Sequence, residues 1–199
     1  DMVQSRGLGD VYKRQSLYNL SISGDTSADV LQRFEAEMSF RERVKEETVI
    51  VFAVGTNDSR YLHNDLGHDD VSPNNYKENL KSLIEQSKSY TESVFVLGLS
   101  PVDESKTLPI PWSTDKYYTN ERIHKYSKIA KEVAQGTNSF YVDVSADEFM
   151  ADSSDGLHPG PSGHEMIFKQ FHTSLLENNI ITTVSYTHLR AHETGPSRV

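Results

Sequence analysis

The chain has 199 residues, with 29 acidic and 20 basic side chains and a net charge of −9, and this acidity argues against a nucleic acid or an anionic membrane as its partner. Cysteine is absent, which excludes disulfides, thiolate catalysis and a metal site built on cysteine. No apolar run approaches the length of a membrane-spanning helix, and the length suits one domain with a substantial core.

Both ends of the chain have the sequence expected of translated adapter DNA. Residues 5–15 (SRGLGDVYKRQ) can be encoded by a transposase adapter that is used to prepare sequencing libraries. The reverse complement of the same DNA, in a shifted frame, encodes residues 184–193. Because one DNA segment in two orientations accounts for both ends, we expect residues 1–15 and 184–199 to be non-native, and residues 16–183 to be one domain cut from a longer gene.

The domain begins with a short apolar run and a turn. Residues 17–22 are mostly apolar and lead into Ser-Gly-Asp-Thr, which predicts a strand turning into a helix capped by Asp25 or Thr26. Apolar residues then recur at near-helical spacing and predict an amphipathic helix that ends before Thr48. Residues 48–54 (TVIVFAV) are apolar throughout and β-branched, which predicts a strand covered by helices on both faces.

Strands and helices continue to alternate to the end of the domain. The predicted elements are a helix opened by Ser72-Pro73, a strand at 93–99, a long connection at 100–119, a helix at 120–135, a strand at 140–144 and a helix at 162–178. This order implies an α/β fold, with a parallel sheet between two layers of helices and right-handed crossovers. In such sheets, sites form at the carboxyl ends of the strands.

The loop at residues 155–159 (DGLHP) has the pattern of half a nucleophilic hydrolase, although its residue types also suit a surface turn. The carboxylate of Asp155 can turn back to one imidazole nitrogen of His158, which leaves the other nitrogen free as a base. Asn57 and Gly24 follow predicted strands and are expected at the same sheet edge. Their N–H groups can face the oxyanion of an ester under attack, where one donor is typically worth roughly 3 kcal/mol.

Three sequence blocks together resemble those of the SGNH (GDSL-type) serine hydrolase family. They are SISGDTS at 21–27, GTND at 55–58 and DGLHP at 155–159, in the family's order and at its usual spacing. The closest likeness is to the small bacterial branch of lysophospholipases, thioesterases and arylesterases. Each block is short, and the specificity of the match comes from the ordered triple.

The resemblance implies a flavodoxin-like three-layer α/β/α sandwich with a five-stranded parallel sheet. It also implies that His158 and Asp155 complete a Ser-His-Asp triad, that Gly24 and Asn57 line the oxyanion hole, and that no metal or organic cofactor is needed. The expected partner is a small ester, thioester or acetylated sugar, with no nucleic acid and no integral membrane segment. We expect a soluble protein, cytoplasmic rather than secreted.

One family block is missing from this chain: the central strand that ends in Gly-Asp-Ser and carries the nucleophile. Its place is just upstream of Leu17, where the adapter-derived segment ends. We therefore expect the parent protein to be an esterase or lipase, and the chain as printed to be inactive and poorly folded because strand edges are left unpaired. Ser23 and Ser100 also lie near the predicted site, but turn and capping roles fit these hydroxyls better.

Other residues near the predicted site leave alternatives open. Residues 63–70 contain two histidines and three aspartates that could bind a divalent metal, but no helix fixes their spacing and a solvated loop fits better. We expect Asp58 to bind substrate, and Trp112 either to cover an acyl chain or sugar or to close the edge of the core. The rivals of the esterase are a carbohydrate O-acetyl esterase that uses the same residues and a non-catalytic binding module on the same fold.

Overall fold

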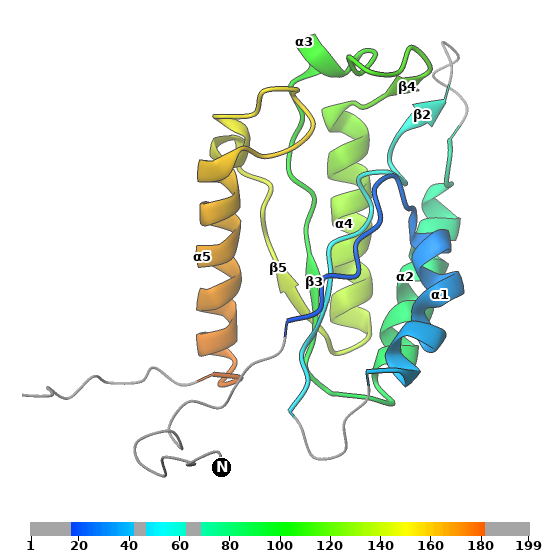
Figure 1. Ribbon diagram of the computed structural model, residues 1–199, viewed down its shortest axis with the longest axis vertical. Coiled ribbons are helices and arrows are strands. Elements are labelled where there is room, and N and C mark those ends of the chain that lie inside the picture. Colours follow the sequence, from blue (N-terminus) through cyan, green and yellow to red (C-terminus); the bar gives the residue numbers. More distant parts are fainter. Residues whose placement is uncertain (1–16, 42–46, 63–68, 182–199) are drawn as a thin grey trace, which may run out of the picture.

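The computed structural model describes residues 17–41, 47–62 and 69–181, which form three layers (Figure 1). The middle layer is a parallel sheet with the order β1-β3-β5. Its strands are β1 (Ile50–Phe52), β3 (Val94–Leu97) and β5 (Phe140–Val142). One face is covered by α1 (Ser27–Ser39), α2 (Pro73–Ser87) and α4 (Asn120–Gly136), and the other by α5 (Pro161–Glu177). The predicted α/β fold with a parallel sheet is therefore confirmed.

The three strands differ in how well the helices cover them. Val94, Phe95 and Val96 of β3 have 0% exposed surface, because helices pack on both of its faces. In β1, by contrast, Val51 is 39% exposed between two buried neighbours. The prediction that residues 48–54 are covered on both faces is therefore wrong, since α5 packs its apolar side chains against β3 and β5 rather than against β1.

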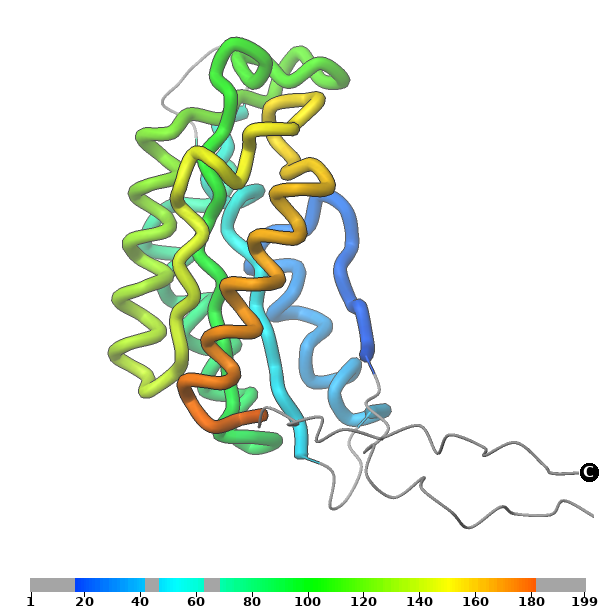
Figure 2. The backbone as a smooth tube through the Cα atoms, turned by 90° about the vertical axis from the view of Figure 1, so that its left-hand side faces the viewer, coloured from blue at the N-terminus to red at the C-terminus, as the bar shows by residue number. Residues whose placement is uncertain are grey.

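The segment before α1 is not a strand. Leu17 is 94% and Ile22 is 55% exposed, and in Figure 2 this dark-blue segment runs apart from β1. A strand needs a neighbour with which to exchange backbone hydrogen bonds, and within the described ranges β1 pairs with β3 alone. The strand predicted at residues 17–22 is therefore wrong, and the described sheet has three strands instead of the five that the resemblance implies.

The helices α1 and α2 begin where local chemistry predicts. The hydroxyl of Ser72 accepts a hydrogen bond from the backbone N–H of Asn75 at 3.2 Å, and Pro73 occupies the first turn of α2. At the start of α1, Asp29 accepts from the backbone N–H of Thr26 at 2.9 Å and from its hydroxyl at 2.7 Å. These caps fix where each helix leaves the sheet edge.

The connection at residues 100–119 contains structure that the sequence analysis did not predict. It holds α3 (Glu104–Thr107) and β4 (Lys116–Tyr117), and a 3₁₀ turn, η2 (Asp147–Met150), follows β5. β4 pairs antiparallel with β2 (Tyr61–Leu62), so that Tyr61 lies opposite Tyr117 and Leu62 opposite Lys116. This β2-β4 ribbon lies with α3 at the end of the molecule where the parallel strands finish (Figure 1). None of the described helices is both long and apolar enough to cross a membrane.

Candidate active site

His158 and Asp155 form a hydrogen-bonded pair on the loop before α5. Nδ1 of His158 lies 2.8 Å from Oδ2 of Asp155. The other carboxylate oxygen accepts from the backbone N–H groups of Leu157 and His158, both at 2.8 Å, so one side chain holds the loop and the imidazole together. Gly156 between them has φ +79°, and a Cβ there would lie 2.9 Å from the side chain of Lys106, so the tight turn requires glycine.

The electrostatics of this pair favour a histidine that acts as a base. Burial raises the pKa of Asp155, but the hydrogen bonds from the backbone and ring of His158 and from the backbone of Leu157 outweigh burial and lower the pKa to about 2. The carboxylate is therefore ionised at neutral pH. A charged acceptor beside Nδ1 favours the tautomer with its proton on Nδ1, which leaves the lone pair of Nε2 free.

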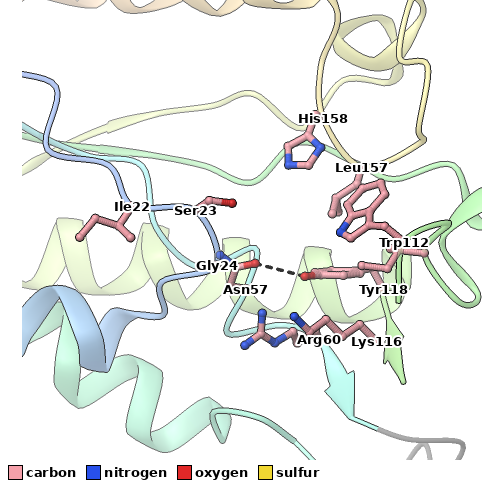
Figure 3. A pocket seen from close by; sticks show the side chains of 11 residues that line it. Ile22, Ser23, Gly24, Asn57, Arg60, Trp112, Lys116, Tyr118, Leu157 and His158 are labelled. Carbon is pink, nitrogen blue, oxygen red and sulfur yellow. Dashed lines mark hydrogen bonds between the residues drawn. The ribbon is translucent and has the colours of Figure 1, made fainter. Parts of the chain in front are cut away.

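The free edge of the imidazole faces a pocket of about 320 Å³ (Figure 3). Gly24, Asn57, Trp112 and His158 all line it, although they come from four separate segments of the chain. Trp112 is 55% exposed, and its ring stacks on the imidazole with centroids 5.8 Å apart and an interplanar angle of 21°. Trp112 thus stands at the mouth of the pocket and does not close the edge of the core.

Two hydrogen bonds fix the orientation of the Asn57 amide. Its Nδ2 donates to the backbone carbonyl of Asp25 at 2.8 Å, and its Oδ1 accepts from the hydroxyl of Tyr118 at 3.1 Å (Figure 3). Burial raises the pKa of Tyr118 against the lowering effect of the Arg60 guanidinium, so the phenol keeps the proton that it donates. The Asp25 carbonyl accepts from one N–H of Nδ2, and the second N–H makes no hydrogen bond within the described residues, so a ligand there can accept from it.

Asp58 does not reach the pocket, so the predicted contact with substrate does not fit its position. Its carboxylate is 0% exposed and accepts from the backbone N–H of Ser27, which lies 3.0 Å from each oxygen, and from the Ser27 hydroxyl. Asn79 donates to the same hydroxyl at 3.0 Å. Burial raises the pKa of Asp58 although the bonds from Ser27 lower it. Asp58 therefore ties the start of α1 to the loop after β1, which brings Gly24 close to Asn57.

The remaining residues singled out in the sequence fall into two groups. Ser23 lines the pocket, but among the described residues no hydrogen bond joins its hydroxyl to His158, and Ser100 is not part of the lining. Residues 63–68, with most of the predicted metal cluster, lie outside the described residues. Asp69 and Asp70 form ion pairs with Arg122 and Arg60, and the described ranges contain no group of three or more possible metal ligands.

Three polar lining residues were missed by sequence reasoning: Arg60, Lys116 and Tyr118. Arg60 follows Asn57 by three residues, and Lys116 and Tyr118 alternate along a short extended segment. That alternation, inside a long connection at a sheet edge, is the signal that could have pointed to them. The alternation predicts that the side chains of Lys116 and Tyr118 share one face of the segment, but it does not predict which part of the protein that face contacts.

Comparison with known proteins agrees with this architecture. The chain matches the model of the GDSL-like Lipase/Acylhydrolase family over residues 3–166, and no curated protein matches it in a sequence search. The match begins inside the segment that the sequence analysis predicts to be adapter-derived, a segment that lies outside the described residues.

Solved structures share the fold at low sequence identity. A lipase/acylhydrolase from Enterococcus faecalis is 24% identical with a TM-score of 0.58, over 76% of this chain and 71% of that one. The acetylxylan esterase Axe2 from Geobacillus stearothermophilus is 22% identical with a TM-score of 0.58, over 77% and 69%. The α/β hydrolase LAE5 from the metagenome of Lake Arreo, Spain, is 18% identical with a TM-score of 0.55, over 76% and 68%. Since the family model covers most of the sequence, this chain belongs to the GDSL-like lipase/acylhydrolase family.

Proposed function

We propose that the pocket is the acyl-transfer site of a serine ester hydrolase. The observation that carries this proposal is the imidazole of His158, fixed through Nδ1 by Asp155 at 2.8 Å, with its free edge on the pocket that Gly24 and Asn57 also line. A base with a defined tautomer, placed across from amide donors, is the arrangement that acyl transfer requires.

The proposed reaction has two balanced halves. A serine hydroxyl attacks the ester carbonyl carbon while its proton passes to Nε2 of His158, and the carbonyl electrons move to the oxygen, which accepts from the N–H groups of Asn57 and Gly24. The oxyanion collapses, the bond to the alcohol or thiol breaks, and the leaving group takes the proton from His158. Water then attacks the acyl-enzyme by the same steps and releases the acid.

The nucleophile is expected outside the described residues. The sequence pattern predicts it on a strand upstream of Leu17, and this stays a prediction. Within the described residues β1 pairs with β3 alone and Val51 is 39% exposed, which is consistent with a further strand beside β1 outside those residues. Ser23 is the serine of the pocket lining and is the alternative within the described residues.

Hydrolysis of p-nitrophenyl acetate tests the proposal on two proteins. One is the chain as printed, and the other is the same chain extended upstream by the residues that its source gene encodes. We expect the extended protein to turn over the ester and its His158→Ala variant to lose most of that rate, while the printed chain is no faster than its own His158→Ala variant. Equal rates for the extended protein with and without His158 would remove the proposed mechanism.

A second substrate class is favoured by the exposed ring of Trp112 beside the base. An exposed indole at a pocket mouth can stack on a sugar ring, so deacetylation of acetylated sugars by the same residues is the alternative reaction. A parallel assay of acetylated xylan and of a long-chain acyl thioester separates the two substrates. Trp112→Ala should raise KM for the sugar ester more than for the thioester if the ring binds the sugar.

A further inference from the structure

The charge of the pocket lining is opposite to that of the protein. The sequence has 29 acidic and 20 basic residues, yet the residues that line the pocket, all within the described ranges, include Arg60 and Lys116 and no aspartate or glutamate. The net charge of −9 repels anions at long range. A cationic lining in such a protein is therefore a local feature of this site.

The β2-β4 ribbon brings the two cations together. Its antiparallel register places Leu62 opposite Lys116, and continuing it by two residues places Arg60 opposite Tyr118. Side chains two residues apart on a strand share a face, so Lys116, Tyr118 and Arg60 all project from the same side of the ribbon. That side is the pocket, where both cationic side chains extend beside Tyr118 (Figure 3).

The two cations differ in whether their charge is already matched. The Arg60 guanidinium forms an ion pair with Asp70, and its side chain is only 12% exposed. Lys116 is half-buried, and none of the described carboxylates lies within ion-pair distance of its ammonium group. Within the described part of the chain, the charge of Lys116 is therefore not matched by a carboxylate.

The surplus charge lies close to the proposed reaction centre. Tyr118 hydrogen-bonds Asn57 at 3.1 Å and also interacts with Arg60, and Lys116 lines the same pocket as Asn57 and Tyr118. An anionic group on a small substrate can thus reach Lys116 while its ester carbonyl lies at Asn57. The apolar side chains of Ile110 and Leu157 complete the lining and suit the carbon frame between the two groups.

We propose that this pocket selects esters that carry a carboxylate or phosphate group, and that Lys116, with Arg60 beside it, determines this specificity. The inference rests on the proposed function, because it assigns the substrate class of the same site. A neutral ester leaves the Lys116 ammonium without a counter-ion in a half-buried position, whereas an anionic ester pairs with it.

Binding can be measured without any turnover, because Trp112 is the single tryptophan of the sequence and lines the pocket. Its fluorescence is titrated in the upstream-extended protein carrying His158→Ala, which prevents turnover, with 4-acetoxybenzoate, with phenyl hydrogen succinate and with the neutral methyl 4-acetoxybenzoate. The two anionic probes carry the carboxylate on the leaving-group side and on the acyl side respectively. The variants are Lys116→Gln and, as a control for net charge, Lys128→Gln, whose side chain is 79% exposed on α4.

We expect at least one anionic probe to bind about tenfold more tightly than the neutral ester. Lys116→Gln should remove that preference and leave the neutral ester unchanged, Lys128→Gln should match the parent chain, and added salt should weaken the anionic probe alone. The side with the tighter probe identifies which part of the ester carries the anion. Unchanged far-ultraviolet circular dichroism of Lys116→Gln excludes an effect of misfolding.

Equal affinities for anionic and neutral probes, no binding of either, or a loss in Lys116→Gln that affects both classes equally would overturn the inference. Hydrolysis is measured separately on the upstream-extended protein. Tight anionic binding without hydrolysis leaves the charge selection intact and contradicts the proposed function. Hydrolysis of neutral and anionic esters at equal kcat/KM supports the proposed function and contradicts the charge selection.

Discussion

Removal of the buried carboxylate of Asp58 should destabilise the fold more than any exposed cap at the same helix end. In Asp58→Ala the backbone N–H and the hydroxyl of Ser27 both lose their acceptor in a site with 0% exposure. Each buried donor left without a partner costs about 1–3 kcal/mol, so the expected loss in the free energy of unfolding is about 3 kcal/mol. The change also frees the start of α1, and Gly24 with it.

Asp29 provides a matched control for this prediction. It receives the same two kinds of donor, the backbone N–H of Thr26 at 2.9 Å and its hydroxyl at 2.7 Å, at the same end of α1, but it is exposed. Water can replace its carboxylate, so Asp29→Ala should cost about 1 kcal/mol or less. Urea unfolding followed by circular dichroism measures both variants. Equal losses for the two would refute the argument that burial makes Asp58 the anchor.

The pH dependence of the stability that Asp58 contributes gives an independent check. Burial raises the pKa of Asp58 above the value of 3.8 that it has in an unfolded chain. The folded state therefore binds a proton more tightly than the unfolded state, so this residue costs stability as the pH rises through 3.8 toward the raised pKa. Asp58→Asn does not titrate. The stability of the parent chain relative to Asp58→Asn should thus fall over that pH range and then level off, and a rise would contradict the assigned direction.

Three further predictions concern the proposed reaction in the upstream-extended protein. Asn57→Ala should lower kcat about 10²–10³-fold with little change in KM, as expected for a donor that acts on the oxyanion, and a near-normal kcat would remove Asn57 from the mechanism. Tyr118→Phe should lower kcat about fivefold, because the 3.1 Å bond that orients the amide is worth about 1 kcal/mol, and an effect on KM alone would contradict this role. Because the pKa of Asp155 is lowered from 3.8 to about 2, its contribution to stability is complete above 3.8 and is lost as the pH falls through about 2. Asp155 therefore stays ionised between pH 4 and 8, and the pH–rate profile over this range should contain no step from the titration of Asp155. A step that is present in the parent protein and absent from Asp155→Asn would contradict this.

The start of α2, the buried strand β3 and the Asp155–His158 pair were predicted correctly from the sequence. Ser72 and Pro73 start α2 as a cap and a first-turn proline should, and the apolar run around β3 forms the fully buried strand. The Asp155 and His158 pair was also predictable, because the two residues are three positions apart and their loop closes on itself. For the helix cap and for the Asp155–His158 pair, the deciding contacts lie within one element or one turn.

The errors came from contacts that no local pattern encodes. Residues 17–22 are apolar enough for a strand, but a strand exists only with a partner, and they have none in the described sheet. Val51 lies in an apolar run and was therefore predicted to be buried. Its exposure depends on where α5 packs, which the local sequence does not encode. Asp58 looked like a substrate ligand beside Asn57, but its partner, Ser27, is distant in sequence.

The cationic part of the site illustrates the same limit. Arg60 and Tyr118 lie far apart in sequence and meet only because β2 and β4 pair. Neither strand has the length or the alternation that predicts a hairpin, and the residues between them include a complete helix, α2. The sequence therefore pointed to His158, Asn57 and Gly24, which we propose as the base and the oxyanion donors, while Arg60, Lys116 and Tyr118 were found only in the structure.

Covalent labelling with a fluorophosphonate, followed by mass spectrometry of the labelled peptide, tests the central claim most directly, because the reagent reacts with a serine that a base and an oxyanion site activate. We predict one label in the upstream-extended protein, on a serine that precedes Leu17, with labelling greatly slowed in His158→Ala and no label in the chain as printed. A label on Ser23 would keep the site and correct the nucleophile. Labelling of the extended protein at the same rate with and without His158 would contradict the account.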